Sequence, residues 1–459
     1  MKKLRLALMP VRASSNRPAY QVAHDYLSIP LGVLYLATYL EKKQLPLDIF
    51  VHDEPSQIIQ FQPDIVGMSC VSQNFGVAQR NARQFKEVMD CKVFLGGPHI
   101  TNMPDFLPEC FDLGFVGEGE VSLEKVLLAY LDGKAFEEKI KLIPGLLIPQ
   151  DIGLMKTGPA ERVEEMDELP LINRKKWVYS LGMTHMMTTR GCPYRCFFCD
   201  SPYVFKGFRG NSSDYVVKEI ESILHAYPET KYIRFYDDIF VADRKRLVEL
   251  SKRFERDPRL TSLSYSGFVR DKLVDEEMVA QLKKMNFILV QFGADSGSPG
   301  VLKKLKSSQV GDSQRALDLF YHSGIKVGCS FVIGSPFETM EDLKKTYDFI
   351  LSNKEKIFEL EINPAVVLPG TPLWSHAQQR GLLPKVIDWE AFRDPAYLPM
   401  FNFDKYIYVA ELIPKNEFGD MVKRFLDLVE EIHDKNDTVQ FMKDHAIPEY
   451  VPSSFKNRF

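Results

Sequence analysis

The segment Cys192-Pro193-Tyr194-Arg195-Cys196-Phe197-Phe198-Cys199 brings three cysteines together, with spacings of three and then two intervening residues. A glycine precedes the segment and a proline lies within it, which indicates a loop. Three thiolates can hold a four-iron cluster and leave one iron without a protein ligand. A substrate or cofactor can bind at that open iron. We therefore predict that Cys192, Cys196 and Cys199 are the metal ligands of a [4Fe-4S] cluster.

The alternatives are a structural zinc site and three unrelated thiols. Structural zinc normally takes paired ligands from two separated positions. The sequence has no second Cys/His pair, although His185 is a candidate fourth ligand. The chain has seven cysteines, an odd number, and a disulfide framework is not expected. The remaining cysteines lie in apolar surroundings and are predicted to be core thiols: Cys70, Cys91, Cys110 and Cys329.

The composition is that of an ordinary globular protein. The 459 residues are 45% hydrophobic, so the chain can bury a large core, and its length suggests two or three domains. The 58 basic and 62 acidic residues give a formal net charge of -4, which provides no bulk attraction to nucleic acid or anionic lipid. The apolar run at the start is too short for a signal peptide or a membrane span. We expect a cytoplasmic protein without a nucleic-acid or membrane partner.

Upstream of the cysteines, short apolar runs alternate with amphipathic stretches, which indicates an α/β fold with a parallel sheet covered by helices. Strands are predicted at 4–10, 47–52, 65–70, 92–95 and 113–116, with helices at 31–43, 76–88 and 122–131. The strands are nearly continuous apolar runs, as expected for a sheet covered on both faces. We predict a doubly wound, Rossmann-like domain over residues 1–135. The charged, Pro- and Gly-bearing stretch 136–184 is interpreted as a linker.

A second series of strands and helices begins just before the cysteines. Strands are predicted at 185–189, 232–236, 262–268, 288–293, 326–333 and 359–367, with helices at 215–226, 244–254, 276–285, 313–323 and 340–353. This series predicts a partial (β/α)6 barrel over residues 185–383, with its active site at the carboxyl ends of the strands. Residues 384–459 are predicted to form a mainly helical extension, with a helix near 418–433. Its aromatic residues are Trp389, Phe392, Tyr397, Phe401, Phe403, Tyr406 and Tyr408.

The cysteine segment resembles the radical S-adenosylmethionine (SAM) superfamily, in which an aromatic residue such as Phe198 usually precedes the third cysteine. The resemblance implies that the amino and carboxylate groups of SAM chelate the open iron. It also implies that one electron from the cluster cleaves SAM to a 5′-deoxyadenosyl radical, which abstracts hydrogen from an unactivated position. The protein positions the cofactor and excludes water.

Other segments up to about residue 375 resemble the same family. Phe235-Tyr236-Asp237-Asp238 matches the end of the second barrel strand. Gly293-Ala294-Asp295-Ser296-Gly297 matches a Gly-x-Glu-Ser-Gly segment in which a shorter Asp replaces Glu, so its contact to the cofactor ribose stays open. Segments 331–339 and 368–373 match the fifth and sixth strand ends. The SAM-binding residues implied by the resemblance are Phe198, Asp237, Asp238, Ser264, Arg270, Gln291, Asp295 and Ser296.

Structural explanations also fit these residues. Asp237 and Asp238 suit the N-terminal cap of the helix predicted at 244–254. Arg270 can fork onto the carboxylate of SAM, and it suits a surface ion pair with Asp271 or Asp275 equally well. The glycines and prolines of the fifth and sixth strand ends suit ordinary turns.

In the first series, glycine-containing segments at 64–69, 96–99 and 117–120 follow or close predicted strands. Loops at the carboxyl ends of parallel strands form the ligand crevice of such sheets, and glycine lets the backbone approach a bulky group. With Pro30-Leu31-Gly32, the set resembles the cobalamin-binding-like domain that precedes many radical enzymes. The crevice residues implied are Ser69, Ser72, Asn74, Gly96, Gly97, His99, Gly117, Glu118 and Glu120.

Two features set this domain apart. The Asp-x-His-x-x-Gly signature of other cobalamin proteins is absent, and the crossover at 53–63 is too short for a full helix. His99 suits a metal ligand, and a local cap or hydrogen bond equally well. Glu118 and Glu120 suit anchors for cofactor amides, or the N-terminal region of the following helix.

The resemblance implies an enzyme that uses a [4Fe-4S] cluster, SAM and cobalamin to methylate an unactivated carbon or phosphorus centre. One alternative is a radical SAM enzyme that catalyses cyclisation, ring contraction or oxidation, with or without cobalamin. Another is a non-catalytic iron–sulfur or zinc scaffold. We expect a small-molecule or peptide substrate and an electron donor such as a flavodoxin or ferredoxin. The sequence assigns no catalytic residue.

Overall fold

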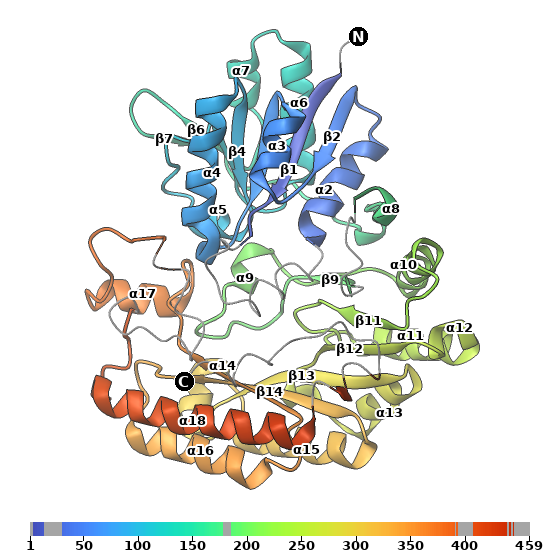
Figure 1. Ribbon diagram of the computed structural model, residues 1–459, viewed down its shortest axis with the longest axis vertical. Helices are drawn as coiled ribbons and strands as arrows, with labels where there is room; N and C mark the ends of the chain where they lie inside the picture. The colour runs from blue at the N-terminus through green and yellow to red at the C-terminus, as the bar shows by residue number, and fades with distance from the viewer. Residues whose placement is uncertain are drawn as a thin grey trace.

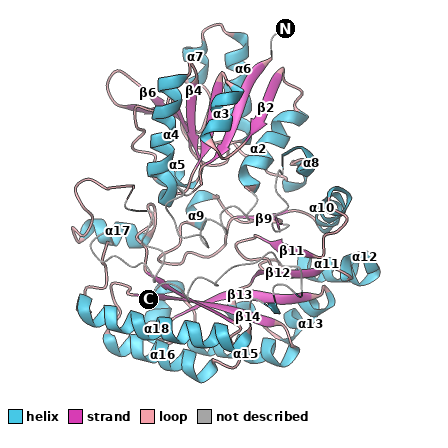
Figure 2. Cartoon of the chain, in the orientation of Figure 1, coloured by secondary structure: helices cyan, strands magenta, loops and turns pink. Residues whose placement is uncertain are grey.

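The computed structural model describes residues 3–12, 30–177, 185–390, 392, 407–437, 440–441 and 444. Two sheets dominate it, one in the N-terminal third and one in the centre of the chain (Figure 1). Helices cover both faces of the first sheet and the outer face of the second (Figure 2). The predicted α/β fold, with a Rossmann-like sheet ahead of a partial barrel, is confirmed.

The first sheet has the strand order β2-β1-β3-β4-β5-β6-β7. Strands β1 to β5 pair in parallel, and β6 and β7 add antiparallel. The strands are β1 Leu4–Pro10, β2 Leu47–Val51, β3 Ile65–Ser69, β4 Lys92–Gly96, β5 Leu113–Phe115, β6 Leu146–Pro149 and β7 Leu154–Lys156. The helices around them are α2 Leu31–Lys42, α3 Pro55–Phe61, α4 Phe75–Val88, α5 Pro98–Asn102, α6 Glu120–Asp132 and α7 Phe136–Ile140.

Alternate residues of the strands enter two separate cores. In β1, Leu6 packs with α2 and α6 on one face, whereas Ala7 packs with α4 on the other. Both residues are fully buried. This explains why the sequence shows nearly continuous apolar runs rather than alternation, since both faces of the sheet are covered.

Two expectations for this region need correction. Residues 136–184 are not only a linker, because β6 pairs with the edge of β5 through Gly114 and Leu147 and β7 extends the sheet further. The strands are too short and too close to turns to be recognised by their pattern. The crossover at 53–63 does form a short helix, α3, with Pro55 in its first turn. It ends at Phe61 and is followed by Gln62, whose φ is 51°.

The second sheet is an open, all-parallel half-barrel with the order β15-β14-β13-β12-β11-β8. Its strands are β8 His185–Met186, β11 Tyr232–Phe235, β12 Ser264–Phe268, β13 Phe287–Asp295, β14 Lys326–Ile333 and β15 Glu359–Pro364. Its outer helices are α10 Ser213–Ala226, α11 Arg244–Arg256, α12 Pro258–Thr261, α13 Glu276–Lys284, α14 Pro299–Lys306, α15 Val310–Ser323 and α16 Met340–Asn353. The predicted first strand is shorter than expected, because a separate ribbon follows it.

That ribbon joins β9 (Thr189–Arg190) to β10 (Arg209–Gly210), and the cysteines and α9 (Ser201–Val204) lie between its strands. Short elements complete the chain: α8 Arg174–Trp177, α17 Pro372–Gln379 and the 3-10 turns Ser72–Asn74, Met166–Glu168 and Asp271–Leu273.

The described part of the C-terminal extension is a long helix, α18 (Lys415–Asn436), which packs beside α16 at the edge of the barrel (Figure 1). His433 on α18 accepts a hydrogen bond from the backbone N–H of Leu360 at 3.0 Å. Before α18, the ring of Trp389 packs against Phe75 and His99 of the first domain. Tyr397, Phe401, Phe403 and Tyr406 lie outside the described residues. Within the described residues, no helix combines the length and apolarity needed to span a membrane.

Candidate functional site

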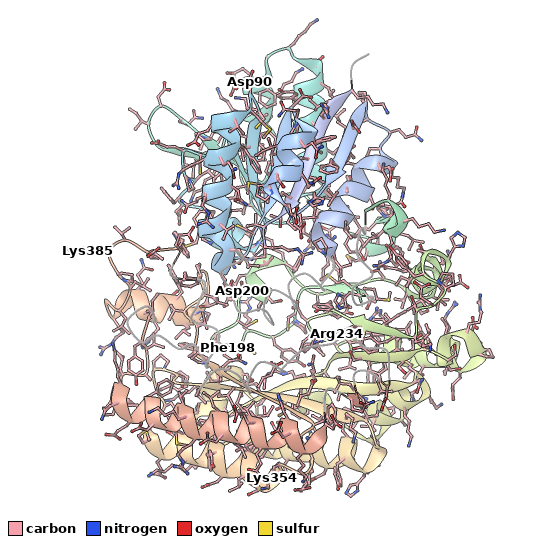
Figure 3. The ribbon with its side chains drawn as sticks, viewed as in Figure 1. Asp90, Phe198, Asp200, Arg234, Lys354 and Lys385 are labelled. Atoms are coloured by element: carbon pink, nitrogen blue, oxygen red, sulfur yellow. The ribbon has the colours of Figure 1, made fainter. Side chains whose placement is uncertain are left out.

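The cysteine loop follows β9 at the carboxyl edge of the barrel sheet, facing the first domain (Figure 3, labels Phe198 and Asp200). It begins at Gly191, whose φ is 82°, and a Cβ there would collide with the carbonyl oxygen of Gly207. Two backbone hydrogen bonds fix its middle: Phe197 donates to Leu305 at 2.7 Å and accepts from Leu373 at 3.0 Å. The loop is therefore held by α14 and by the start of α17.

The three thiols are half-buried. Burial raises the pKa of Cys199 to about 12. Burial also raises the pKa of Cys196, although the Arg270 guanidinium opposes this effect. Ligation requires the thiolate, so binding depends on the positive charge of the metal itself. In the part of the chain that is described, no three Cys, His, Asp or Glu side chains surround one metal position. The assignment of the three cysteines as cluster ligands stays a prediction.

Arg270 belongs to the cysteine loop rather than to the surface. Its Nη1 lies 3.6 Å from Cys196 Sγ, and its Nη2 donates to the carbonyl of Lys306 at 2.6 Å. The guanidinium also stacks 3.9 Å from the centre of the Tyr194 ring. The alternative surface ion pair with Asp271 or Asp275 is wrong, because Asp275 is paired with Arg244 and the buried Asp271 is paired with Lys306. Arg270 therefore places a positive charge beside the cysteines, where a carboxylate ligand can be received.

Below Arg270, Lys306 forms a buried ion cluster with two carboxylates. Its Nζ lies 3.0 Å from Asp271 Oδ2 and 3.2 Å from Asp295 Oδ2. Burial lowers the pKa of Lys306, but Asp295 and Asp271 outweigh burial and raise it. Asp295 has a φ of 62°, a conformation uncommon for a residue with a side chain. The Asp295 carboxylate thus belongs to an ion cluster at the end of the strand. Its contact with the cofactor ribose stays a prediction.

Ser296 also forms hydrogen bonds within the protein. Its hydroxyl lies 3.1 Å from that of Thr346 and accepts a hydrogen bond from the backbone of Ser298 at 3.1 Å. These contacts fix the loop after β13 to helix α16. Ser296 is almost completely buried. Its contact with SAM stays a prediction.

The two aspartates after β11 differ in burial and in hydrogen-bond partners. Asp237 is fully buried, and its Oδ1 accepts hydrogen bonds from the backbone N–H and hydroxyl of Thr188 at 3.0 and 2.9 Å and from the hydroxyl of Thr189. Its Oδ1 therefore fixes the segment that leads to the cysteines, whereas its buried Oδ2 has no hydrogen-bond partner. The contact of Asp237 with SAM stays a prediction. Asp238 is exposed and accepts a hydrogen bond from Ser201 of α9. Neither caps α11, because Asp243 has that role.

Neither Ser264 nor Gln291 lies at the carboxyl end of its strand. Ser264 begins β12, so it lies at the amino end of the strand, opposite to the cysteine loop. Gln291 projects into the half-barrel, where Arg234 donates to its side-chain oxygen and its amide donates to Glu359 at 3.3 Å. Phe198 packs against a hydrophobic cluster that includes Val332.

The fifth strand end contains a buried acid that the family resemblance did not assign. Glu338 is completely buried and accepts hydrogen bonds from the backbone N–H groups of Gly334 at 2.6 Å and Ser335 at 3.1 Å. Burial raises the pKa of Glu338 to about 8, against the effect of these two hydrogen bonds. The carboxyl group closes the turn after β14.

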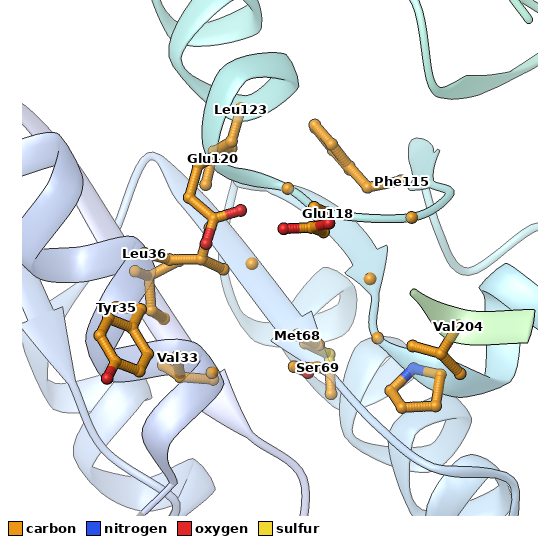
Figure 4. Close-up of a pocket in the computed structure, with 18 of the residues that line it drawn as sticks. Val33, Tyr35, Leu36, Met68, Ser69, Phe115, Glu118, Glu120, Leu123 and Val204 are labelled. Carbon is orange, nitrogen blue, oxygen red and sulfur yellow. The ribbon is translucent and has the colours of Figure 1, made fainter. Parts of the chain in front are cut away.

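A crevice lies between the carboxyl ends of the first sheet and the cysteine ribbon (Figure 4). Its walls come from α2, the ends of β3 and β4, the loop before α6, and the Val204–Phe205 segment at the end of α9. The predicted residues that line it are Ser69, Gly96, Gly97, Gly117, Glu118 and Glu120. A Cβ on Gly97 would lie 2.8 Å from the backbone of Cys70, so only glycine keeps this wall flat. Apolar side chains and bare backbone suit a large, flat cofactor such as a corrinoid.

Three predicted crevice residues lie elsewhere. His99 is stacked on Phe75 with ring centres 3.7 Å apart, and its Nδ1 lies 3.0 Å from the hydroxyl of Ser72. Asn74 donates to the carbonyl of Val11 at 3.0 Å. Burial lowers the pKa of His99 to about 3. Of the two readings of His99, the local hydrogen bond is confirmed, and none of the three lines the crevice.

Glu118 and Glu120 are bound to the barrel rather than free. Arg190 donates from Nη1 to Glu118 and from Nη2 to Glu120, each at 2.6 Å. Arg209 donates to the other oxygen of Glu118. All four side chains are nearly buried. The two acids therefore join the domains, instead of presenting both carboxylates to a cofactor.

The sequence did not single out Arg190, Arg209 or Lys306. The only available signal was the position of Arg190, directly before Gly191 and the cysteines. Arg209 and Lys306 lie outside every motif, and their partners are distant in sequence, so only the tertiary structure reveals them.

The family models match both domains. The Radical SAM superfamily model matches residues 186–350, and the B12 binding domain model matches residues 23–127. The chain belongs to the radical SAM superfamily, in the group whose members carry a B12-binding domain ahead of the barrel. It is thus an enzyme of this class, and a purely scaffolding role is not supported.

Among curated relatives, the chain is 29% identical to an uncharacterized methyltransferase of Pyrococcus horikoshii, over 79% of this chain and 81% of the relative. It is 26% identical to the anaerobic magnesium-protoporphyrin IX monomethyl ester cyclase of Rubrivivax gelatinosus, over 69% of this chain and 61% of the cyclase. The structure resembles the radical SAM methyltransferase TsrM from Kitasatospora setae, solved with tryptophan and a SAM analog, with a TM-score of 0.68 and 20% identity over 83% and 77% of the two chains. This last likeness shows the shared fold.

Proposed function

We propose that this chain is a cobalamin-dependent radical SAM methyltransferase that methylates an unactivated carbon or phosphorus centre. One observation carries the proposal: the crevice of the B12-binding domain and the cysteine loop share a wall. Arg190 lines the crevice and lies two residues before Cys192. Two cofactors bound at these places would face each other across the domain boundary.

When bound, the cluster and SAM supply a 5′-deoxyadenosyl radical, and cobalamin supplies a transferable methyl group. The chain itself positions these groups. Arg270 offers a guanidinium beside Cys196, at the place where the carboxylate of SAM would lie against the open iron. The exposed carboxylate of Asp238 is available on the same side of the sheet for the amino group of SAM. Gly97 and Gly117 keep the crevice walls free of side chains.

The partners are proposed from the chemistry. A small-molecule or peptide substrate would enter the space between the half-barrel and the crevice. Reduction of the cluster requires one electron from outside the chain, for which a flavodoxin or ferredoxin is the expected donor. TsrM was solved with tryptophan, but this says nothing about the substrate of the present chain.

The proposal is tested on protein reconstituted with iron, sulfide and hydroxocobalamin, reduced with dithionite and supplied with SAM labelled in its methyl group. We expect bound corrinoid after desalting, transfer of label to the corrinoid, and formation of 5′-deoxyadenosine. Cys196→Ala should abolish 5′-deoxyadenosine formation. The absence of corrinoid absorbance in the wild-type protein would refute the proposed methyltransferase function.

A second candidate is a radical enzyme that does not transfer a methyl group, and the relationship to the Rubrivivax gelatinosus cyclase favours keeping it. The chain spans only 61% of that cyclase, so the cyclase activity is not transferred to it. This candidate predicts 5′-deoxyadenosine without transfer of label from the SAM methyl group. The same experiment therefore separates the two functions.

A further inference from the structure

We propose that Arg190 is a positioning residue that couples the crevice to the cysteine loop, so that a corrinoid filling the crevice restrains the loop that holds the cluster. This inference rests on the proposed function, because it requires a corrinoid in the crevice. It assigns to Arg190, Glu118 and Glu120 a role in communication between cofactors rather than in holding one of them.

The guanidinium of Arg190 forms ion pairs with two carboxylates at once. The two terminal nitrogens of Arg190 reach two different carboxylates, Glu118 and Glu120, at 2.6 Å each. Only a planar guanidinium can bridge two acids in this way, because a lysine ammonium is a single point charge. The side chains of the three residues are 5–6% exposed. The contact is therefore shielded from water and transmits small displacements.

The crevice and the loop meet at this contact. Glu118, Glu120 and Arg190 all line the crevice, and Gly119 between the two acids lines it as well. On the barrel side, Arg190 is the last residue of β9, which pairs with Arg209 of β10. A corrinoid that fills the crevice would contact the same side chains that anchor the start of the cysteine loop.

The loop has little freedom between Arg190 and the first cysteine. Gly191 is packed so closely against Gly207 that no side chain fits. Cys192 follows immediately. A displacement of Arg190 is therefore passed on to Cys192 through two peptide units instead of being absorbed by a flexible segment.

The charges of the network are balanced, with two guanidinium groups from the barrel ribbon and two carboxylates from the first domain. The Tyr35 ring lies 5.5 Å from the Arg190 guanidinium and is also a wall of the crevice. A corrinoid in the crevice would contact a wall that already holds Arg190 in place.

The experiment measures amide hydrogen exchange of the peptide covering residues 188–199 in cluster-loaded protein, with and without saturating hydroxocobalamin. In the wild type, we expect exchange to slow by about fivefold or more on binding, the lower end of typical coupling between sites. In Arg190→Lys, hydroxocobalamin should still bind, but the protection of the loop should fall below about twofold.

Two variants make the result specific. Glu120→Gln is milder, because it removes one carboxylate charge and keeps the shape of the side chain, and it should give an intermediate loss of protection. Arg12→Lys is the matched control: Arg12 forms another largely buried pair with Asp53, at 2.6 Å, but neither residue lines the crevice. It should leave the protection of the loop at the wild-type level.

The outcomes separate this inference from the proposed function. If the wild-type protein binds no hydroxocobalamin, both fail. If it binds and the loop shows no protection, or Arg190→Lys retains full protection, only the coupling role of Arg190 is overturned. Equal loss of protection in Arg12→Lys and Arg190→Lys would also overturn it, because the effect would then be general loosening of the first domain.

Discussion

The ammonium group of Lys306 lies 3.2 Å from a carboxylate oxygen of Asp295, and both side chains are buried beneath the cysteine loop. Lys306 ends α14, and Asp295 ends β13. The carbonyl of Lys306 also receives Arg270, which contacts Cys196. Lys306 thus contacts both Asp295, at the end of the fourth barrel strand, and Arg270, whose guanidinium lies beside the cysteines.

Lys306→Met is predicted to be strongly destabilising. It leaves Asp271 and Asp295 buried without their cation, and breaking a buried pair by removing one partner costs about 3–5 kcal/mol. The free energy of unfolding, measured by urea denaturation, should fall by this amount. Lys303→Met on the exposed side of the same helix is the control and should change it by less than about 0.5 kcal/mol. A small effect of Lys306→Met would show that the buried cluster is not energetically important.

Gly191→Ala should prevent correct placement of the cysteine loop. The added Cβ would collide with the carbonyl of Gly207, and the residue would also be held at a positive φ. Gly207→Ala is the matched control: Gly207 has a φ of 76° but open space around its Cβ position. The control should show only the conformational cost of about 1–2 kcal/mol. Iron content after reconstitution should fall in Gly191→Ala alone, and equal iron content in both variants would contradict the close packing.

Much of the architecture was predictable, because parallel sheets covered on both faces leave apolar runs and because strand and helix lengths follow from them. The helix at 340–353 and the strand at 326–333 have the predicted bounds. The antiparallel strands β6 and β7 were missed, because they are short and depend on the free edge of β5. Edge pairing of this kind is a tertiary event that leaves little local signal.

The candidate site was predicted less completely. The resemblance selected Arg270, which the structure places beside Cys196, but a motif does not distinguish its exposed residues from its buried ones. Asp237 and Asp238 are neighbours in sequence, yet the first is fully buried and the second is exposed. Glu118 and Glu120 were recognised as important, but their partner Arg190 is about seventy residues away, and such pairings are visible only in the folded chain.

Arg270→Lys is predicted to weaken the binding of SAM while Ser264→Ala leaves it unchanged. Lysine cannot reach Cys196, the Lys306 carbonyl and an incoming carboxylate together. The KM for SAM in 5′-deoxyadenosine formation should rise by about tenfold or more, equivalent to about 1.4 kcal/mol. Ser264 lies at the opposite end of β12 and serves as the control. If Ser264→Ala raised the KM equally, the assignment of the active edge of the barrel would be wrong.

His99→Gln should make protein stability less dependent on pH and leave corrinoid binding intact. The pKa of His99 is lowered to about 3 by burial, so the unfolded chain binds a proton near pH 6.5 that the folded chain does not. Stability is therefore lost as the pH falls below about 6.5, and between pH 7 and pH 5 the loss from His99 is about 2 kcal/mol.

Urea denaturation at the two pH values measures this loss, and the difference between them should shrink by about 2 kcal/mol in His99→Gln. His225→Gln, at an exposed position on α10, should leave the difference unchanged. Hydroxocobalamin retention should equal that of the wild type, because His99 faces Ser72 and Phe75 instead of the crevice. Loss of bound corrinoid in His99→Gln would mean that the histidine reaches the cofactor after all, and the present placement of the crevice would have to be revised.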